Sequence, residues 1–399
     1  MPASPGAAGT RVKALGWGLI AVIVLAGAEL CAVLVERLAE PLMDNPVAAQ
    51  AFGLIPDLDS YEMMSPTVGR HWVLRPGYGR DSSDIAREKA ESGRELGAAA
   101  ARQGATSGMR LEINEQGFKG GPLDPLHRRS RILVLGDSVT FGYAGIDYVR
   151  AFETGLRQRS LDVEVVNGGV EGYAIRNHLL ELDRYLALDP DMVAILIGWN
   201  DLFALTGSEG TLWQRFATGR MADKAVRYLE FRSTSAVERA QALRDKPKRV
   251  DATASDLRRY AELRPAFLDR LERLANAFAG SGAQVVLLTL PGLYRADLEP
   301  TAEALRLGHL PAFTDNPMVL AVLAEGYNRA VAQLGRRHGW RVVDTAAWAE
   351  AKLVPPENFF IDSVHMTGAA YAMLGEFLAG ELADQVHGLP QSAGGGKGP

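Results

Sequence analysis

Ser138 is the first residue whose surroundings suit chemistry. It follows an apolar run in the segment 132–142, ILVLGDSVTFG, and lies where a strand is expected to give way to a helix. A helix start offers free backbone N–H groups and the positive end of the helix dipole, which suits a nucleophile whose attack creates an oxyanion. The alternative is that Asp137 or Ser138 only caps the following helix.

A candidate base lies near the other end of the chain, where Asp362 precedes His365 by three residues in DSVHMT. At this spacing in a turn, the carboxylate can accept a hydrogen bond from the imidazole, which fixes the tautomer and stabilises the imidazolium. The other ring nitrogen is then free to act as a base. We expect Thr367 to cap the last helix. The remaining histidines are interpreted as surface or core residues: His71, His127, His178, His309, His338 and His387.

Two further turns carry groups that can stabilise a negative charge. Gly169 lies in VVNGGVEGY, where glycines let backbone N–H groups approach a substrate oxygen closely. Asn200 lies in ILIGWND, where its side-chain amide can donate to an oxyanion and Asp201 can cap a helix or fix the loop. Each pattern alone is equally typical of an ordinary turn. Trp199 is interpreted as a core residue, with stacking on a sugar ring as the alternative.

Three of these segments directly follow strand-like runs, and the fourth, 362–367, precedes the last helix, so a sheet and its helices must position them. Five short runs rich in Val, Ile and Leu alternate with helical patterns: 132–135, 163–166, 192–197, 285–290 and 341–343. The clearest helical pattern spans 256–278, where Pro265 can kink or restart the helix. The alternation predicts an α/β fold, a flavodoxin-like and mostly parallel five-stranded sheet with helices on both faces. Ligands of such sheets bind beyond the carboxyl ends of the strands.

Composition excludes several classes of function. The chain has 399 residues, 47% of them hydrophobic, and a formal net charge of −5, so it lacks the basic field of a nucleic-acid-binding protein. Its single cysteine, Cys31, excludes disulfide frameworks, thiolate zinc sites and iron–sulfur clusters. Neither a His-x-x-x-His pair nor a carboxylate cluster with ligand spacing occurs, so we expect no metal and no cofactor.

The N-terminus predicts a membrane anchor. The apolar stretch 14–35 is long enough to cross a hydrocarbon core of about 30 Å at about 1.5 Å per residue, and Glu29 is its only charge. Arg11 and Lys13 precede it without any acid, which places residues 1–13 in the cytoplasm and the chain after residue 35 outside. A cleaved signal peptide is the alternative.

The rest of the chain divides by composition. Residues 36–129 form an extracytoplasmic segment that includes a linker-like stretch at 81–108 and a turn at 116–120 that can close a hairpin. We expect residues 130–386 to form the domain that carries the candidate catalytic residues, and residues 387–399 to form a flexible tail. Two insertions, 202–256 and 292–328, have the length of lids or recognition surfaces. The first carries the basic run 244–249, which is interpreted as a solvated face, with attraction of anionic glycans or lipid headgroups as the alternative.

Together the polar segments resemble the four sequence blocks of the SGNH (GDSL-like) hydrolases. The blocks occur in order, and they are Gly136-Asp137-Ser138, Gly169 in the Asn-x-Gly turn, Asn200 in Gly198-x-Asn200-Asp201, and Asp362-x-x-His365. The resemblance covers about 130–386. Membrane-anchored bacterial members are also similar upstream, with an apolar N-terminus and an Asn-x-x-Gly-Phe segment like 114–118.

The resemblance implies a role for each of these residues. Ser138 would be the nucleophile, His365 the general base and acid, and Asp362 the residue that orients the imidazole. The backbone N–H groups of Ser138 and Gly169 and the side chain of Asn200 would form the oxyanion hole. The acyl-enzyme would then be released by water or by a second alcohol.

We therefore expect a membrane-tethered extracytoplasmic serine esterase that acts on acyl esters, above all O-acetyl esters of polysaccharide. One alternative is an O-acyltransferase that uses the same triad to acylate a glycan hydroxyl. A non-catalytic glycan-binding envelope protein is a further alternative, but such a protein has no chemical need for all four blocks together.

Overall fold

The computed structural model describes residues 6–43, 63–66, 72–81, 109–143, 146–205, 216–219, 221–222, 245–255, 257–263, 265 and 267–390 of the chain. The chain separates into two compact units. One comprises residues 1–61, 66–72 and 206–235, and the other comprises residues 62–65, 73–205 and 236–399. Most of the predicted linker, much of the insertion 202–256, and His71 lie outside the described residues.

The larger unit is built on a five-stranded parallel sheet, as the sequence predicts. The strand order is β6-β5-β7-β8-β9. The strands are β5 (Ser130–Gly136), β6 (Val163–Gly169), β7 (Met192–Leu196), β8 (Gln284–Leu288) and β9 (Arg341–Val343). Every residue of β5 and β7 is buried, which explains their unbroken apolar sequence.

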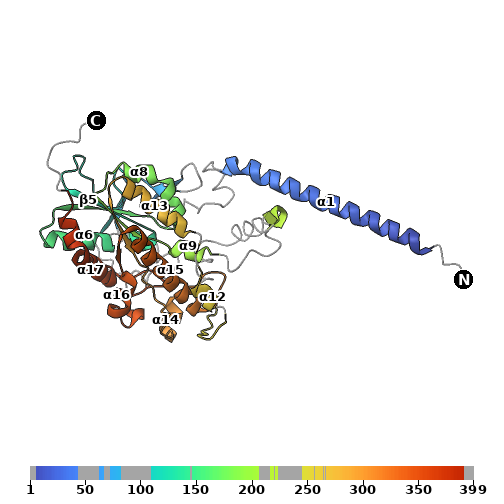
Figure 1. The fold of residues 1–399 in the computed structure, drawn as a ribbon. Helices are drawn as coiled ribbons and strands as arrows, with labels where there is room; N and C mark the ends of the chain where they lie inside the picture. The colour runs from blue at the N-terminus through green and yellow to red at the C-terminus, as the bar shows by residue number, and fades with distance from the viewer. Residues whose placement is uncertain are drawn as a thin grey trace. The chain divides into compact units, whose positions relative to one another are not determined.

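Helices cover both faces of this sheet, as Figure 1 shows. The helix α6 (Tyr148–Gln158) packs along α17 (Gly368–His387), while α13 (Leu268–Gly280) contacts α15 (Pro317–His338). The shorter helices are α5 (Ser138–Phe141), α7 (Ile175–Leu180), α8 (Leu182–Leu186), α9 (Trp199–Phe203), α12 (Leu257–Ala261), α14 (Ala302–Leu307), α16 (Thr345–Lys352) and the 3-10 turn η3 (Pro356–Asn358).

Local sequence explains several helix boundaries. Thr367 caps α17, as predicted, because its side chain accepts from Ala370 N. The helical pattern at 256–278 is divided: α12 ends at Ala261, and α13 starts after Pro265, whose carbonyl accepts from Leu268 N. A proline has no N–H to continue the first helix, so the chain restarts it.

The hairpin predicted at 116–120 is present. Short strands lie at β1 (Met64–Pro66), β2 (Trp72–Leu74), β3 (Gly79–Asp81) and β4 (Arg110–Glu112), and β3 pairs antiparallel with β4. After β4, Ile113 and Lys119 form an antiparallel bridge. Asn114 Oδ1 accepts from the N–H groups of Gln116 and Phe118 inside the turn, which fixes its shape.

Within the basic run, Asp245, Pro247 and Arg249 are exposed, as interpreted, and Lys246 Nζ donates to Ala312 O at 3.1 Å and Thr314 O at 2.7 Å. One expectation needs correction, because the chain is still packed beyond residue 387, the predicted start of the flexible tail. Leu389 is buried, and Pro390 O accepts from Ser130 Oγ. Residues 391–399 lie outside the described residues.

The smaller unit contains α1 (Gly6–Met43), of which Trp17–Val35 is apolar enough to cross a membrane, with a mean hydropathy of 2.6. A membrane span and a signal sequence both fit this helix. Glu29, the charge within the apolar stretch, accepts from Ala217 N, Thr218 N and Thr218 Oγ1. These donors compensate a carboxylate that apolar surroundings would otherwise disfavour.

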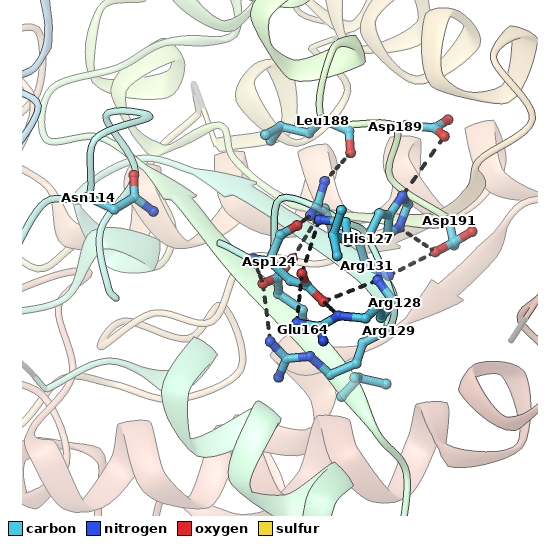
Figure 2. Close-up of polar contacts among 12 residues, drawn as sticks. Asn114, Asp124, His127, Arg128, Arg129, Arg131, Glu164, Leu188, Asp189 and Asp191 are labelled. Atoms are coloured by element: carbon cyan, nitrogen blue, oxygen red, sulfur yellow. Dashed lines mark hydrogen bonds and ion pairs between the residues drawn. The ribbon is translucent and has the colours of Figure 1, made fainter. Parts of the chain in front are cut away.

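A buried ion network joins the amino ends of β5, β6 and β7, as Figure 2 shows. Arg131 Nε lies 2.7 Å from Glu164 Oε2, and both side chains are buried. The other guanidinium nitrogens donate to Leu188 O and Asp124 O, and Asp191 accepts from Arg131 N. Because all of the guanidinium nitrogens are engaged, the charge is well compensated.

Replacement of Arg131 by Met is expected to lower the free energy of unfolding by about 3 kcal/mol, because the buried Glu164 carboxylate loses its closest cation and keeps only the longer contact with Arg129 Nη2 at 3.3 Å. The measurement is chemical denaturation. Activity per folded molecule should stay at the wild-type level, because the network lies at the end of the sheet away from Ser138. If the free energy of unfolding of the Arg131→Met variant is within about 1 kcal/mol of wild type, the contact between Arg131 and Glu164 does not stabilise the fold as proposed.

Candidate active site

Ser138 opens a helix at the carboxyl end of β5, an inner strand that lies between β6 and β7. The preceding Asp137 is the cap of α5, since its Oδ1 accepts from Val139 N at 3.0 Å. The Ser138 hydroxyl is therefore not needed for capping. Gly136 must be a glycine, because a Cβ there would lie 2.5 Å from Leu196 O and 2.6 Å from Thr140 Cβ. The block Gly-Asp-Ser thus places three features in succession: a close backbone approach at Gly136, a helix cap at Asp137 and a half-buried serine whose hydroxyl is not used for capping.

The structure brings together the serine, histidine and aspartate that the sequence singles out. Ser138 Oγ lies 2.7 Å from His365 Nε2, although 227 positions separate them. His365 Nδ1 lies 2.7 Å from Asp362 Oδ2. The other carboxylate oxygen of Asp362 accepts from the N–H groups of Val364 and His365, so the turn itself holds the carboxylate in place.

The charges at this site stabilise one another. Burial disfavours the charged form of both groups, but the attraction between them outweighs it. The pKa of Asp362 is consequently held well below its usual range, and the pKa of His365 lies above its ordinary value of 6.5. The Asp137 carboxylate adds to the increase at His365. With Nδ1–H donating to Asp362, Nε2 is free to accept the Ser138 proton.

Asn200 lies at the start of α9, the helix that follows β7. Its Nδ2 donates one hydrogen to Tyr173 O at 2.9 Å, which leaves the second amide hydrogen for another acceptor. Gly198 has a φ of +144°, and a Cβ there would lie 2.8 Å from the Tyr327 ring. Trp199 is buried, which confirms its interpretation as a core residue.

Asp201 fixes the neighbouring loop. Its Oδ2 accepts from Ile175 N at 2.9 Å, the first residue of α7. Burial raises its pKa to about 6. This hydrogen bond links the loop after β7 to the first residue of α7. The Asn200 hydrogen bond to Tyr173 O links the same loop to the turn that precedes α7.

The structure gives Gly169 another reason to be a glycine than the one expected. The Gly169 N–H donates to Asn167 Oδ1 at 2.9 Å, so it already has an acceptor within the chain. A Cβ on Gly169 would lie 2.3 Å from Phe141 N, because the backbone of α5 packs directly on this residue. Spacing alone could not show this contact.

The turn after Gly169 is hydrogen-bonded to the site at both ends. At its start Val170 N donates to Gly136 O at 3.1 Å, and at its end Tyr173 O accepts from Asn200 Nδ2. Within the turn, Tyr173 N donates to Val170 O at 3.2 Å. Gly172 in this turn has a φ of +77°, a conformation that favours glycine. The turn therefore runs from the end of β5 to the Asn200 side chain.

Sequence reasoning missed the contacts between the insertion 292–328 and the Asp362–His365 turn. Ser363 Oγ accepts from His309 N at 2.8 Å, and Ser363 O accepts from Leu293 N at 2.9 Å. The His309 ring lies 5.0 Å from the Phe203 ring. The insertion thus holds the histidine turn, and no spacing pattern predicts it.

His178 is a core residue, as interpreted. It is fully buried, and burial lowers its pKa to about 4, which keeps the ring neutral. Its Nε2 lies 3.1 Å from Gly136 O and its Nδ1 lies 2.9 Å from Tyr185 OH. Within the residues that the structure describes, His, Cys, Asp and Glu form no group of three or more that could hold a metal ion.

Residues 134–373 match the model of the GDSL-like Lipase/Acylhydrolase family. The chain belongs to this family. The match includes all four sequence blocks and most of the parallel sheet, so the predicted membership of the SGNH hydrolases is confirmed. The chain is accordingly a serine hydrolase of the SGNH type.

Several solved structures are similar to this chain at low identity. A lipase/acylhydrolase from Enterococcus faecalis shares 16% identity over 64% of this chain and 96% of that chain, with a TM-score of 0.39. An acetylxylan esterase from Geobacillus stearothermophilus shares 19% identity over 66% and 95%, with a TM-score of 0.39. An alpha/beta hydrolase from the metagenome of Lake Arreo, Spain, shares 18% over 65% and 99%, with a TM-score of 0.39. No curated protein matches the chain.

Replacement of Gly169 by Ala is expected to lower kcat about 10²-fold, because the new Cβ must push α5, and with it Ser138, away from its present position. The measurement is steady-state hydrolysis of a short acyl ester by the full chain in detergent. Gly280→Ala is the matched control, because a Cβ at Gly280 meets open space. Equal kcat values for the two variants would contradict the close packing at Gly169.

Proposed function

We propose that this SGNH hydrolase is a membrane-tethered extracytoplasmic esterase that removes acyl groups, above all O-acetyl groups, from polysaccharide. The contact between Ser138 Oγ and His365 Nε2 at 2.7 Å, with Asp362 behind the imidazole, is the observation that carries the esterase chemistry. Membership of the GDSL-like family supports action on esters in general.

In the proposed reaction, Ser138 and His365 act as nucleophile and base. His365 Nε2 takes the Ser138 hydroxyl proton as Oγ attacks the ester carbonyl, and the carbonyl electron pair moves onto oxygen. The tetrahedral intermediate collapses when His365 gives its proton to the departing alcohol oxygen, which leaves an acyl group on Ser138. Water then attacks the acyl carbon as His365 Nε2 takes its proton. The bond between the acyl carbon and Ser138 Oγ breaks, His365 returns the proton to Oγ, and the carboxylic acid departs.

We assign the oxyanion donors from the same geometry. The Ser138 N–H lies at the start of α5, and the second amide hydrogen of Asn200 is available after its bond to Tyr173. Because the Gly169 N–H is used by Asn167, we assign the third donor to Gly172, in the turn that joins the end of β5 to Asn200. Each such donor typically contributes about 10²- to 10³-fold in kcat.

The location and substrate class rest on the N-terminus. The apolar helix Trp17–Val35 fits a membrane span, and Arg11 and Lys13 before it favour a cytoplasmic N-terminus. The catalytic unit would then lie near the polysaccharides of the envelope, whose acyl esters are the proposed substrates. Transfer of the acyl group to a glycan hydroxyl uses the same residues, and it differs only in which oxygen attacks the acyl-enzyme.

The proposed nucleophile is tested with a serine-reactive phosphonate and a short acyl ester, using the full chain in detergent. We expect one phosphonate per chain on the peptide that contains Ser138, and turnover reduced about 10⁴-fold or more in Ser138→Ala. Mass spectrometry locates the label. Adding an acylated oligosaccharide and an acceptor separates release of free acid from transfer. A label on another serine would refute the assignment.

The proposed base is tested by the pH dependence of kcat/KM. Activity should rise with pH as His365 loses its proton, with a midpoint above 6.5, because the Asp362 carboxylate raises the pKa of the ring. Asp362→Asn removes that charge, so we expect kcat to fall about 10⁴-fold and the midpoint to move to lower pH. An unchanged midpoint in this variant would show that Asp362 does not act on the titrating group.

A further inference from the structure

Lys119 is a buried lysine in the hairpin that precedes the catalytic domain. Its side chain is only 4% exposed, and its Nζ lies 2.8 Å from the equally buried Asp147 Oδ2. The same Nζ donates to Phe141 O at 2.5 Å and lies 4.9 Å from the centre of the Phe141 ring. A buried ammonium is disfavoured unless it is paired and hydrogen-bonded, and here it has both kinds of partner.

The carbonyl that Lys119 binds belongs to the helix that starts with Ser138. The helix α5 has four residues and ends at Phe141, so its last carbonyls have no partner within the helix. Phe141 O is bound by Lys119 Nζ, and Thr140 O is bound by Asn167 Nδ2 at 3.0 Å. Both donors lie outside α5: Lys119 belongs to the hairpin and Asn167 to β6. The hairpin and β6 therefore help to set the orientation of α5.

The two donors also hold one another in place. Lys119 and Asn167 form an antiparallel backbone bridge that joins the hairpin to β6. Asp147, the ion-pair partner, caps α6 through its Oδ1, which accepts from Arg150 N at 2.8 Å. Lys119 therefore connects three elements: the end of α5, which begins with Ser138, the start of α6, and β6.

We propose that Lys119 is a positioning residue for the nucleophile: by binding Phe141 O and Asp147 together, it holds α5 so that Ser138 Oγ stays within reach of His365 Nε2. The proposal rests on the assignment of Ser138 as nucleophile. Lys119 lies upstream of residues 134–373, which match the family model. The hairpin would thus contribute to the position of the nucleophile, although it lies outside the residues that match the family model.

The test compares phosphonate labelling in the full chain with Lys119→Met/Asp147→Asn, which removes both charges and leaves neither unpaired. Labelling separates two quantities, the number of reactive sites and the rate constant of their reaction. We expect one reactive site per chain, as in wild type, but a rate constant about 10- to 100-fold lower, with kcat for a short ester reduced in proportion and KM within about twofold. A merely structural role would lower the number of sites and leave the rate constant unchanged.

Arg131→Met/Glu164→Gln is the matched control. It removes an ion pair of similar burial at the opposite end of β5, and it should lower the thermal midpoint without changing the rate constant of labelling. If the Lys119→Met/Asp147→Asn variant does not fold, Lys119→Gln/Asp147→Asn, which replaces the ion pair by a neutral pair that can still form hydrogen bonds, is measured in its place, and a smaller decrease of the rate constant, still more than about twofold, is expected. A rate constant within twofold of wild type in a folded variant overturns the proposal. Failure of wild type to react would refute the proposed function instead.

Discussion

The hydrogen bond between Ser138 and His365 is the contact on which the site depends. Its two atoms are 227 positions apart in the sequence and meet because Ser138 follows the inner strand β5 and the Asp362–His365 turn lies beside the carboxyl end of that strand. A hydroxyl is a weak nucleophile until a base accepts its proton, so a shift of about 1 Å in either group removes most of the rate. Much of the surrounding structure can be understood as limiting that shift.

Each partner of this contact is held by more than its own element. On the serine side, Asp137 caps the start of α5. Gly169, which has no side chain, allows β6 to contact the backbone of α5 directly. On the histidine side, Asp362 is fixed by two backbone N–H groups, and Ser363 is bound by the insertion that carries His309. The burial that these contacts require also shifts proton affinity, which raises the pKa of Asp137 to about 6.

The sequence predicted the sheet because buried parallel strands are apolar on both faces, and all five runs were recognisable for that reason. It also predicts that Ser138 and Asn200 lie at one edge, because both follow parallel strands, whereas the meeting of Ser138 with the Asp362–His365 turn was predicted from the resemblance to the SGNH hydrolases. It could not predict the contacts between segments distant in the chain. Gly169 was interpreted as a donor, although its N–H is used by Asn167, and Lys119 gave no signal because a lysine is normally exposed.

The most direct test of the central contact is a crystal structure of the enzyme after reaction with a phosphonate ester. The account predicts phosphorus bonded to Ser138 Oγ, His365 Nε2 within hydrogen-bond distance of an oxygen of the adduct, and the Asn200 amide directed at the phosphoryl oxygen. An adduct on a different residue, or an imidazole well away from Ser138 in the modified enzyme, would contradict it.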